Sequence, residues 1–322
     1  RQALARTLLT RASSELGAGV RRVWRHLHDG DVLLVNRQPT LHRASIMAHR
    51  ARVLHNKNQV IRMHYANCNT YNADFDGDEI NLHFPQNELS RAEAYGVAAT
   101  REQYVTVKDG SPLRGLIMDH VDAGALLTMR GTLLNRDEFQ QLVYIACCDL
   151  MGRGDDVHIE CPPPAILKPE PRWTGKQVVT ALLSHITRGM PGLALSAKSK
   201  VPTKMWVDKG VKADDELYDQ VVVFRGGEML RGVLDKAAFG ASAFGFVHAV
   251  YELYGSKAAA DLLTALGRVF TQFMQWHGHT CGLDDLVLTE EAEAQRRGII
   301  NAACAKGVRA AAAFAGVEDA EE

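Results

Sequence analysis

The sequence has only six cysteines in 322 residues, at irregular spacing and without a C-x-x-C pair. A small disulfide-stapled module is therefore excluded, and the thiols are expected to be reduced and intracellular. A basic-then-apolar leader is also missing, so no signal peptide is expected. The longest uncharged apolar stretch, residues 237–251, falls short of the roughly 20 residues that a membrane span needs. We expect no membrane anchor and find no internal repeat.

The sequence also has almost no net charge. Lys and Arg number 37 and Asp and Glu 38, so the total of −1 does not indicate a nucleic-acid-binding protein. This total conceals two adjoining segments of opposite sign. Residues 20–65 carry nine Lys/Arg against two Asp, with six histidines besides, whereas residues 66–95 carry six Asp/Glu against one Arg. A segment near +7 therefore leads directly into a segment near −5.

The remaining composition is that of a packed globular protein. Hydrophobic residues make up 46% of the chain and charged residues 23%, which excludes a disordered or low-complexity chain. At roughly 100 to 200 residues per domain, the length predicts two or three domains.

Local patterns predict short strands first and helices afterwards. Brief β-favouring runs predict strands over 31–35 and 59–64, and Asn87 is expected to cap a helix that reaches about Ala99. Further helices are expected up to Leu127, over 139–150, and over 258–274, where apolar residues recur at i, i+3, i+4 spacing. The Ala-rich residues 301–316 can also form a helix, whose acidic end at 318–322 is expected to fray.

Two segments lack a helical pattern. The proline-rich residues 161–164 and 168–171 predict a stiff extended connection at the surface, because proline cannot propagate a helix. The lysine-rich residues 196–212 are expected to form a mobile loop, whose lysines are either solvated or bound to phosphate.

One segment is not explained by core packing, namely residues 71–80, YNADFDGDEI. Asp74, Asp76 and Asp78 alternate along it, and with Glu79 they place four carboxylates within six residues, without a cation among them. Two like charges about 4 Å apart repel by roughly 1 to 4 kcal/mol near a protein surface. A hard divalent cation relieves this repulsion, since Mg²⁺ takes oxygen ligands. Gly77 supplies the backbone freedom that lets the three aspartates converge.

Other readings of these aspartates are weaker. An EF-hand loop that began at Asp74 would need Gly at position 6 and Glu at position 12, where Glu79 and Pro85 stand. The D-x-D pattern of sugar-nucleotide transferases occurs twice, but it is common by chance. A solvated acidic turn stays open as an alternative, although apolar residues on both sides favour a turn that is held against a core.

A second candidate segment lies upstream, at residues 35–42. Arg37 offers a planar fork of donors that suits phosphate or ribose oxygens, and Pro39 stiffens the backbone beside it. Taken alone, Arg37 is better explained as an arginine in a surface turn, and only the two segments together make a specific signal.

Five segments together resemble, in order, the largest subunit of multisubunit DNA-directed RNA polymerases. They are NRQPTLH (36–42), YNADFDGDE (71–79), FPQNELSRAEA (84–94), KPEPRWTGKQ (168–177) and HTCGLDDL (279–286). Among the eukaryotic classes, the segments HYAN (64–67), HFPQN (83–87) and SPLRGLI (111–117) are more similar to polymerase I than to polymerases II or III. The resemblance covers essentially the whole chain but identifies it as an internal fragment, since the clamp, bridge helix, trigger loop and jaw of the family are missing.

The resemblance implies an α+β fold in three consecutive pieces. These are an active-site domain with a double-psi β-barrel over residues 1–115, a mixed α/β pore domain over 116–255, and the mainly helical start of the funnel domain over 256–322. Ile80 stands where the family commonly has Met, a volume-conserving change.

The same resemblance implies the site and its chemistry. Asp74, Asp76 and Asp78 match the three ligands of a permanent Mg²⁺, and a second Mg²⁺ arrives with the NTP. Arg37 and Asn72 match residues that contact the ribose of the incoming nucleotide or the RNA end. The expected activity is DNA-templated nucleotidyl transfer by a two-metal mechanism, in which no side-chain base is obligatory.

The implied partners are the second-largest subunit and the other polymerase I subunits, template DNA, nascent RNA and NTPs, in the nucleus and nucleolus. The basic residues 20–65 would neutralise phosphates of the RNA–DNA hybrid. The alternative is an inactive structural or interaction fragment when the chain is separated from the other subunits.

The remaining candidates are best interpreted as structural. His277, His279 and Cys281 lack a fourth ligand at zinc-like spacing, and Cys147 and Cys148 are expected to be buried thiols in a helix. The glycine pairs 226–227 and 240/245 are not phosphate-binding loops, since no G-K-[ST] follows them. Lys168 and Lys176 either line the pore or lie on a solvated surface.

Overall fold

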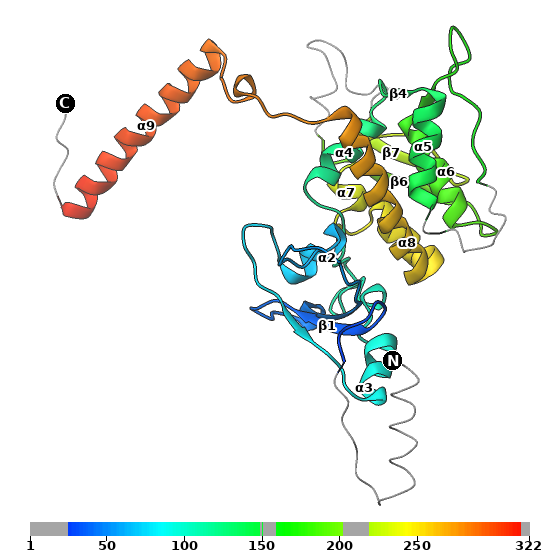
Figure 1. Cartoon of the computed structure of the whole chain (residues 1–322). Helices are drawn as coiled ribbons and strands as arrows, with labels where there is room; N and C mark the ends of the chain where they lie inside the picture. Colours follow the sequence, from blue (N-terminus) through cyan, green and yellow to red (C-terminus); the bar gives the residue numbers. More distant parts are fainter. Residues whose placement is uncertain (1–24, 149, 151–158, 202–218, 317–322) are drawn as a thin grey trace, which may run out of the picture. The chain divides into compact units, whose positions relative to one another are not determined.

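The computed structural model describes residues 25–148, 150, 159–201 and 219–316, whose helices and small sheets form an α+β fold (Figure 1). The α+β prediction is therefore confirmed. The chain divides into two units, Arg1–His277 and Gly278–Glu322, which are described one at a time. No helix among the described residues is both long and apolar enough to cross a lipid bilayer.

The first sheet of unit 1 is next to the acidic motif in the sequence. Its strands are β1 (Val32–Asn36), β2 (Ile46–Arg50) and β3 (Asn81–His83), which pair antiparallel in the order β2-β1-β3. The predicted strand over 31–35 is confirmed within one residue. The described strands form antiparallel sheets of two or three strands, and no closed barrel is found among them.

The strand predicted over 59–64 is wrong. Residues 59–64 belong to neither a strand nor a helix, and α2 (Tyr65–Tyr71) begins directly after them. Val60 and Ile61 are 64% and 53% exposed. Because no described strand pairs with this segment, its β-branched residues have no neighbour against which to pack, and local propensity alone does not form a strand.

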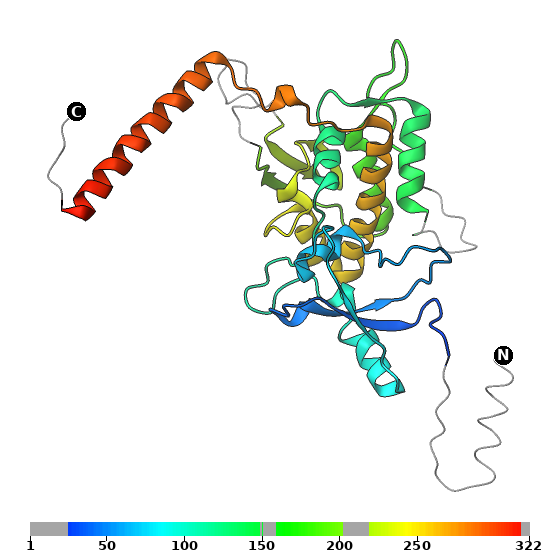
Figure 2. The same cartoon turned by 60° about the vertical axis from the view of Figure 1, so that its left-hand side comes forward.

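The larger part of unit 1 is a helical core around α8 (Phe246–His277), which packs against α4 (Asp119–Thr128), α5 (Arg136–Cys147), α6 (Gly175–Ile186) and α7 (Lys236–Phe239) (Figure 2). The predicted apolar face over 258–274 is confirmed, since its residues from Ala258 to Phe273 line the core. The helix is kinked at Gly255, where φ is 88°, a left-handed value that glycine readily adopts.

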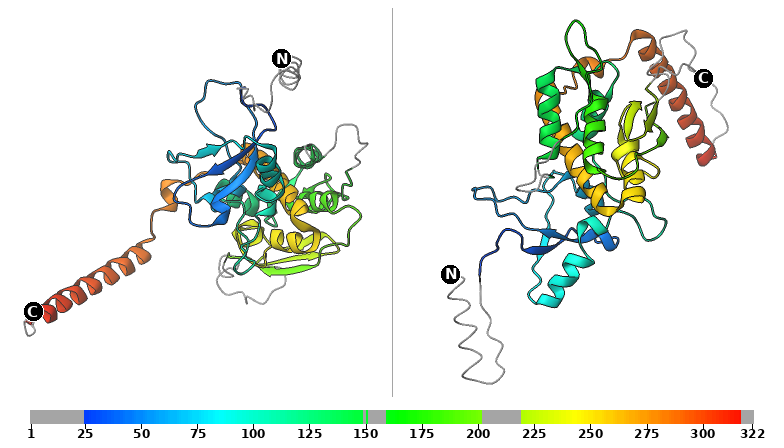
Figure 3. Two further views of the ribbon diagram at one scale, coloured as in Figure 1. Left: turned by 90° about the horizontal axis from the view of Figure 1, so that it is seen from below. Right: turned by 90° about the vertical axis from the view of Figure 1, so that its right-hand side faces the viewer.

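Two small sheets complete the helical part. The strands β6 (Leu195–Lys198), β7 (Val221–Arg225) and β8 (Glu228–Arg231) pair antiparallel in that order, and β4 (Leu133–Leu134) pairs with β5 (Trp173–Thr174). The right-hand view in Figure 3 shows the sheet of β1 and β2 at one end of this helical part. The loop predicted over 196–212 is wrong at its start, because residues 196–198 belong to β6; residues 202–218 lie outside the described residues.

Capping residues set several helix boundaries. The predicted cap at Asn87 is confirmed, since its side chain accepts a hydrogen bond from the Ser90 amide at 2.6 Å and α3 spans Glu88–Gly96. The helices predicted near Leu127 and over 139–150 correspond to α4 and α5. The proline-rich connection is confirmed as non-helical, with a β-bridge between Ile166 and Arg172.

Unit 2 contains the long helix α9 (Glu290–Ala315). It begins at the N-cap Thr289 and ends at Gly316, whose φ of 68° gives the left-handed C-cap typical of glycine. The helix predicted over 301–316 is thus confirmed and begins earlier than expected, while residues 318–322 lie outside the described residues. The residues of α9 are exposed or half-buried within this chain.

Lys176 is buried in the helical core and forms an ion pair there. Its Nζ donates to the Thr128 carbonyl at 2.7 Å and lies 3.2 Å from Oδ1 of Asp219. The same carboxylate accepts hydrogen bonds from the backbone amides of Arg130 and Gly232. Lys176 is only 8% exposed, so both sequence-based interpretations, a pore-lining residue and a solvated one, are wrong. The sequence does not indicate this burial, because the partner Asp219 lies 43 residues away.

We expect Lys176→Met to destabilise the chain by about 3 to 5 kcal/mol, because it leaves the carboxylate of Asp219 buried without its cation. Thermal unfolding followed by circular dichroism measures the loss. The matched control is Lys168→Met, the same substitution at an exposed lysine, which should change stability by less than about 0.5 kcal/mol. Equal melting temperatures for the two variants would contradict the role of the pair.

Candidate metal centre

The acidic motif forms a loop between α2 and β3. The N-cap of helix α2 is His64, whose Nδ1 accepts a hydrogen bond from the Ala66 amide, and its C-cap is Asn72, with φ 48° and ψ 42°. Asparagine tolerates this left-handed conformation better than most residues. Gly77 has φ 117°, a value that favours glycine, and it lies in a bend before β3. Both ends of the loop are thus fixed by regular structure.

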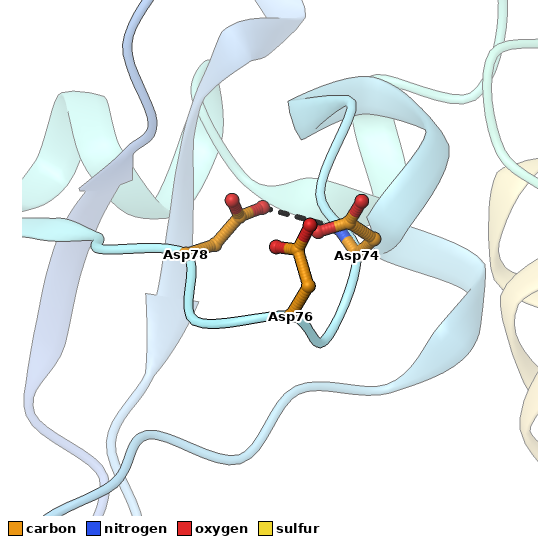
Figure 4. Close-up of side chains that lie close together, drawn as sticks. All are labelled: Asp74, Asp76 and Asp78. Atoms are coloured by element: carbon orange, nitrogen blue, oxygen red, sulfur yellow. Dashed lines mark hydrogen bonds between the residues drawn. The ribbon is translucent and has the colours of Figure 1, made fainter.

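The loop brings the three aspartates together. One carboxylate oxygen from each of Asp74, Asp76 and Asp78 lies within 4.8 Å of the others, and Figure 4 shows Asp76 lying between the two flanking aspartates. The Asp74 amide donates a hydrogen bond to Oδ2 of Asp78 at 3.1 Å, which closes the loop. Asp74 and Asp76 are exposed and Asp78 is half-buried. The fourth acidic residue of the motif, Glu79, is exposed and is not part of this cluster.

Arg37 reaches the cluster from the end of β1. Its Nε lies 2.7 Å from Oδ2 of Asp78, and its Nη2 donates to Oδ1 of the same carboxylate at 3.0 Å. Its Nη1 donates to the Tyr71 carbonyl at 3.3 Å. The fork of donors expected from the sequence is therefore used, and in this structure it holds one of the aspartates and the end of α2.

The three carboxylates differ in their electrostatic environment. The hydrogen bond from Arg37 holds the pKa of Asp78 below its ordinary value. The pKa of Asp76 is raised, first by its hydrogen bond with Asp74 and then by the negative charge of that neighbour. One guanidinium faces three carboxylates, so the cluster keeps an excess of negative charge.

The donor set fits a hard divalent cation. Carboxylate oxygens are the preferred ligands of Mg²⁺ and Ca²⁺, and three converging carboxylates can occupy one face of an octahedron. The exposed side of the cluster leaves room for the waters that Mg²⁺ retains. Among the described residues, this cluster is the group of three or more acidic, His or Cys side chains that converge closely enough to hold a metal. His277, His279 and Cys281 do not form such a group.

The two residues predicted to contact the substrate differ in exposure and in their hydrogen-bond partners. Asn72 is exposed at the C-terminal end of α2, two residues before Asp74. Arg37 is half-buried and bonded to Asp78. Sequence reasoning missed the support behind the loop, where the hydroxyl of Tyr71 forms a 2.8 Å hydrogen bond with Nε2 of His49. No signal in the sequence links residues so far apart.

The adjacent thiols of Cys147 and Cys148 contact other parts of the protein at the end of α5. Cys147 is buried in α5, and burial raises the pKa of its thiol to about 11. Cys148 is half-buried, and its Sγ lies 2.9 Å from Nη1 of Arg268. The expectation of buried thiols in a helix is confirmed for Cys147 and in part for Cys148.

Two family profiles match this chain. "RNA polymerase Rpb1, domain 2" matches residues 2–100, which include the acidic loop and the first sheet. "RNA polymerase Rpb1, domain 3" matches residues 103–286, which include the helical core. The boundary between them falls within η2 (Thr100–Glu102), because the first profile ends at residue 100 and the second begins at residue 103.

Similar proteins include DNA-directed RNA polymerase subunits from several organisms. DNA-directed RNA polymerase I subunit rpa1 of Dictyostelium discoideum is 46% identical over 322 residues, covering 100% of this chain and 20% of that protein. The subunit of the same name from Schizosaccharomyces pombe is 45% identical, covering 98% and 19%. DNA-directed RNA polymerase III subunit rpc1 of S. pombe is 34% identical, covering 88% and 19%. The chain thus spans about a fifth of the length of these relatives.

Proposed function

This chain belongs to the RNA polymerase Rpb1 family, of which it carries domains 2 and 3, and from that premise we propose that it supplies the metal centre for DNA-templated RNA synthesis. The observation that carries the proposal is the convergence of Asp74, Asp76 and Asp78 within 4.8 Å. The higher identity to polymerase I subunits than to a polymerase III subunit supports synthesis of ribosomal RNA, in the nucleolus.

The proposed role of the aspartates is to hold Mg²⁺. When bound, Mg²⁺ ions supply the positive charge that activates the 3′-hydroxyl of RNA and stabilises the pyrophosphate leaving group, one ion held by the triad and a second delivered with the NTP. Asp76 provides an exposed carboxylate between the other two, so it would complete the ligand face. The Asp78 carboxylate is oriented by Arg37 and by the hydrogen bond that it accepts from the Asp74 backbone amide.

Arg37 and Asn72 are proposed to contact the ribose of the nucleotide or the RNA end. Arg37 uses Nε and Nη2 on Asp78, while its Nη1 makes a long 3.3 Å bond to the Tyr71 carbonyl. That N–H group is the one most easily turned toward a ribose hydroxyl. Asn72 is exposed beside the same loop. Both residues are therefore placed to contact a nucleotide or an RNA end that is bound at the metal.

The proposed architecture follows the family. Residues 1–115 would contribute the double-psi β-barrel domain, 116–255 the pore domain, and 256–322 the start of the funnel domain. The first boundary agrees with the change from the small sheet to the helical core. The proposed partners are the second-largest subunit, the other polymerase I subunits, template DNA, nascent RNA and NTPs.

Mn²⁺ titration of the 322-residue chain, followed by electron paramagnetic resonance of the free ion, tests the metal centre directly. We expect one bound Mn²⁺ per chain and at least about tenfold weaker binding in Asp76→Asn, because loss of an indirect metal-orienting group already costs 10- to 100-fold. The matched control is Glu79→Gln, which removes an adjacent charge outside the cluster. Equal affinity of Asp76→Asn and the unaltered chain would overturn the proposal.

A further inference from the structure

Arg114 is a buried cation without a carboxylate partner. Arg114 is 8% exposed. Its Nε and Nη2 both donate hydrogen bonds to Oδ1 of Asn67, at 3.2 and 2.9 Å. Among the described residues no Asp or Glu forms an ion pair with it. Burial lowers the pKa of Arg114 to about 10, so it stays charged at neutral pH. Burying a charge in this way is costly, so its position requires an explanation.

The segment around Arg114 joins two hydrophobic clusters of unit 1. Leu113 packs against the cluster below the first sheet, which contains Tyr71 and Met47. Leu116 is fully buried in the helical core, and its amide donates to the Phe239 carbonyl at 3.0 Å. Residues 113–116 therefore form a joint between the sheet that flanks the acidic loop and the helices.

Helix α2 is bonded to this joint twice. Arg114 holds Asn67 in the first half of the helix, and Nδ2 of Asn69 donates to the Leu113 carbonyl at 2.8 Å. On the sheet side, the hydroxyl of Tyr71 is bonded to His49. Asp74 follows three residues after Tyr71, so a rotation or shift of α2 would move the aspartates directly.

We propose that Arg114 is a positioning residue, which holds Asn67 and thereby fixes α2 and the loop of Asp74, Asp76 and Asp78 relative to the helical core. The inference rests on the proposed function of that loop as a metal centre. Arg114 acts at a distance from the chemistry, through hydrogen bonds to a helix that precedes the metal ligands. It explains why a charged side chain is buried where a hydrophobic one would pack at less cost.

This role has a kinetic signature that simple loss of stability lacks. A misplacement of about 1 Å at a reacting centre costs up to about 10²-fold in rate. In Arg114→Met we therefore expect kcat for single-nucleotide addition to fall roughly 10- to 100-fold, with a higher Mg²⁺ concentration at half-maximal rate. The KM for NTP should rise as well, because Asn72, which is proposed to contact the ribose, directly follows α2 and shifts with it.

The experiment uses the assembled polymerase that contains the full-length subunit, with rates expressed per active complex on a primed RNA–DNA scaffold. Lys176→Met is the matched control, because it replaces another buried cation by the same residue without touching α2. Arg114→Lys can donate to Asn67 from one nitrogen and should regain part of kcat. Hydrogen exchange should show faster exchange of the α2 amides in Arg114→Met and unchanged exchange there in Lys176→Met.

An unchanged kcat and Mg²⁺ requirement in Arg114→Met would overturn the proposal, as would equal losses in Lys176→Met. If Arg114→Met does not assemble, Asn67→Ala removes the acceptor while leaving Arg114 in place, and the same expectations apply to it. The two hypotheses fail separately. Normal kinetics of the Arg114 and Asn67 variants beside an inactive Asp76 variant reject the positioning role alone, whereas an active Asp76 variant rejects the metal centre itself.

Discussion

Replacing Asp76 by alanine is expected to lower RNA extension by the assembled polymerase about 10²- to 10³-fold, while the subunits still assemble. Asp76 is exposed and lies between Asp74 and Asp78, so its side chain contributes to no core packing. Its loss removes one of three converging carboxylates. The remaining two retain Arg37 on one of them, which leaves too little negative charge to hold a divalent cation against water.

The measurement is extension of a primed RNA on a DNA template at increasing Mg²⁺, with assembly checked by size-exclusion chromatography. Excess Mg²⁺ should restore little activity, because the ligand geometry is lost as well as affinity. Glu79→Gln, next to the cluster but outside it, serves as the control and should extend RNA within about threefold of the unaltered enzyme. Extension by the Asp76 variant at a tenth or more of the normal rate would contradict the assignment.

The aspartate cluster was predictable from the sequence because the determinants are local. Three carboxylates at alternate positions, with Gly77 between the last two, are enough to predict convergence. The Arg37–Asp78 pair was not predictable in the same way, since the partners are 41 residues apart. They meet because β1 and β3 pair with Asn36 opposite Asn81, which places the residues that flank these strands side by side.

The helices were predicted better than the strands for a related reason. The apolar repeat over 258–274 and the cap at Asn87 are properties of one segment, and both are confirmed. A strand needs a partner, and the run over 59–64 has none among the described residues. Burial of Lys176 and Arg114 depends on polar partners on distant segments, so neither could be predicted from a local sequence pattern.

Close backbone approach at the joint leads to the second large effect, which concerns stability. We expect Gly115→Ala to destabilise the chain by about 3 kcal/mol, at the upper end of the cost of overpacking. A Cβ at Gly115 would lie 2.2 Å from the carbonyl carbon of Gly240 and 2.4 Å from the Ala241 amide nitrogen. Both are backbone atoms, which cannot move aside as a flexible side chain can.

Neither the backbone at Gly115 nor the backbone at Gly240 has space to move away from the other. Gly240 itself faces the Lys236 carbonyl, 2.4 Å from where a Cβ would lie, and the Leu116 amide is bonded to the Phe239 carbonyl beside it. Relief therefore requires the joint to separate from α7, which breaks that hydrogen bond and opens the core at Leu116. For a domain of this size, a loss of about 3 kcal/mol lowers Tm by roughly 6 to 12 °C.

Thermal unfolding of the 322-residue chain measures this shift, with Gly96→Ala as the matched control. Gly96 ends α3, and a Cβ there would meet no heavy atom within 4 Å, so alanine should leave stability unchanged or raise it by up to about 1 kcal/mol. If Gly115→Ala and Gly96→Ala have the same Tm, the backbone at residues 113–116 can move freely against α7. Such freedom would also remove the physical basis for coupling α2 to the helical core, because a joint that slides cannot fix the loop that it supports.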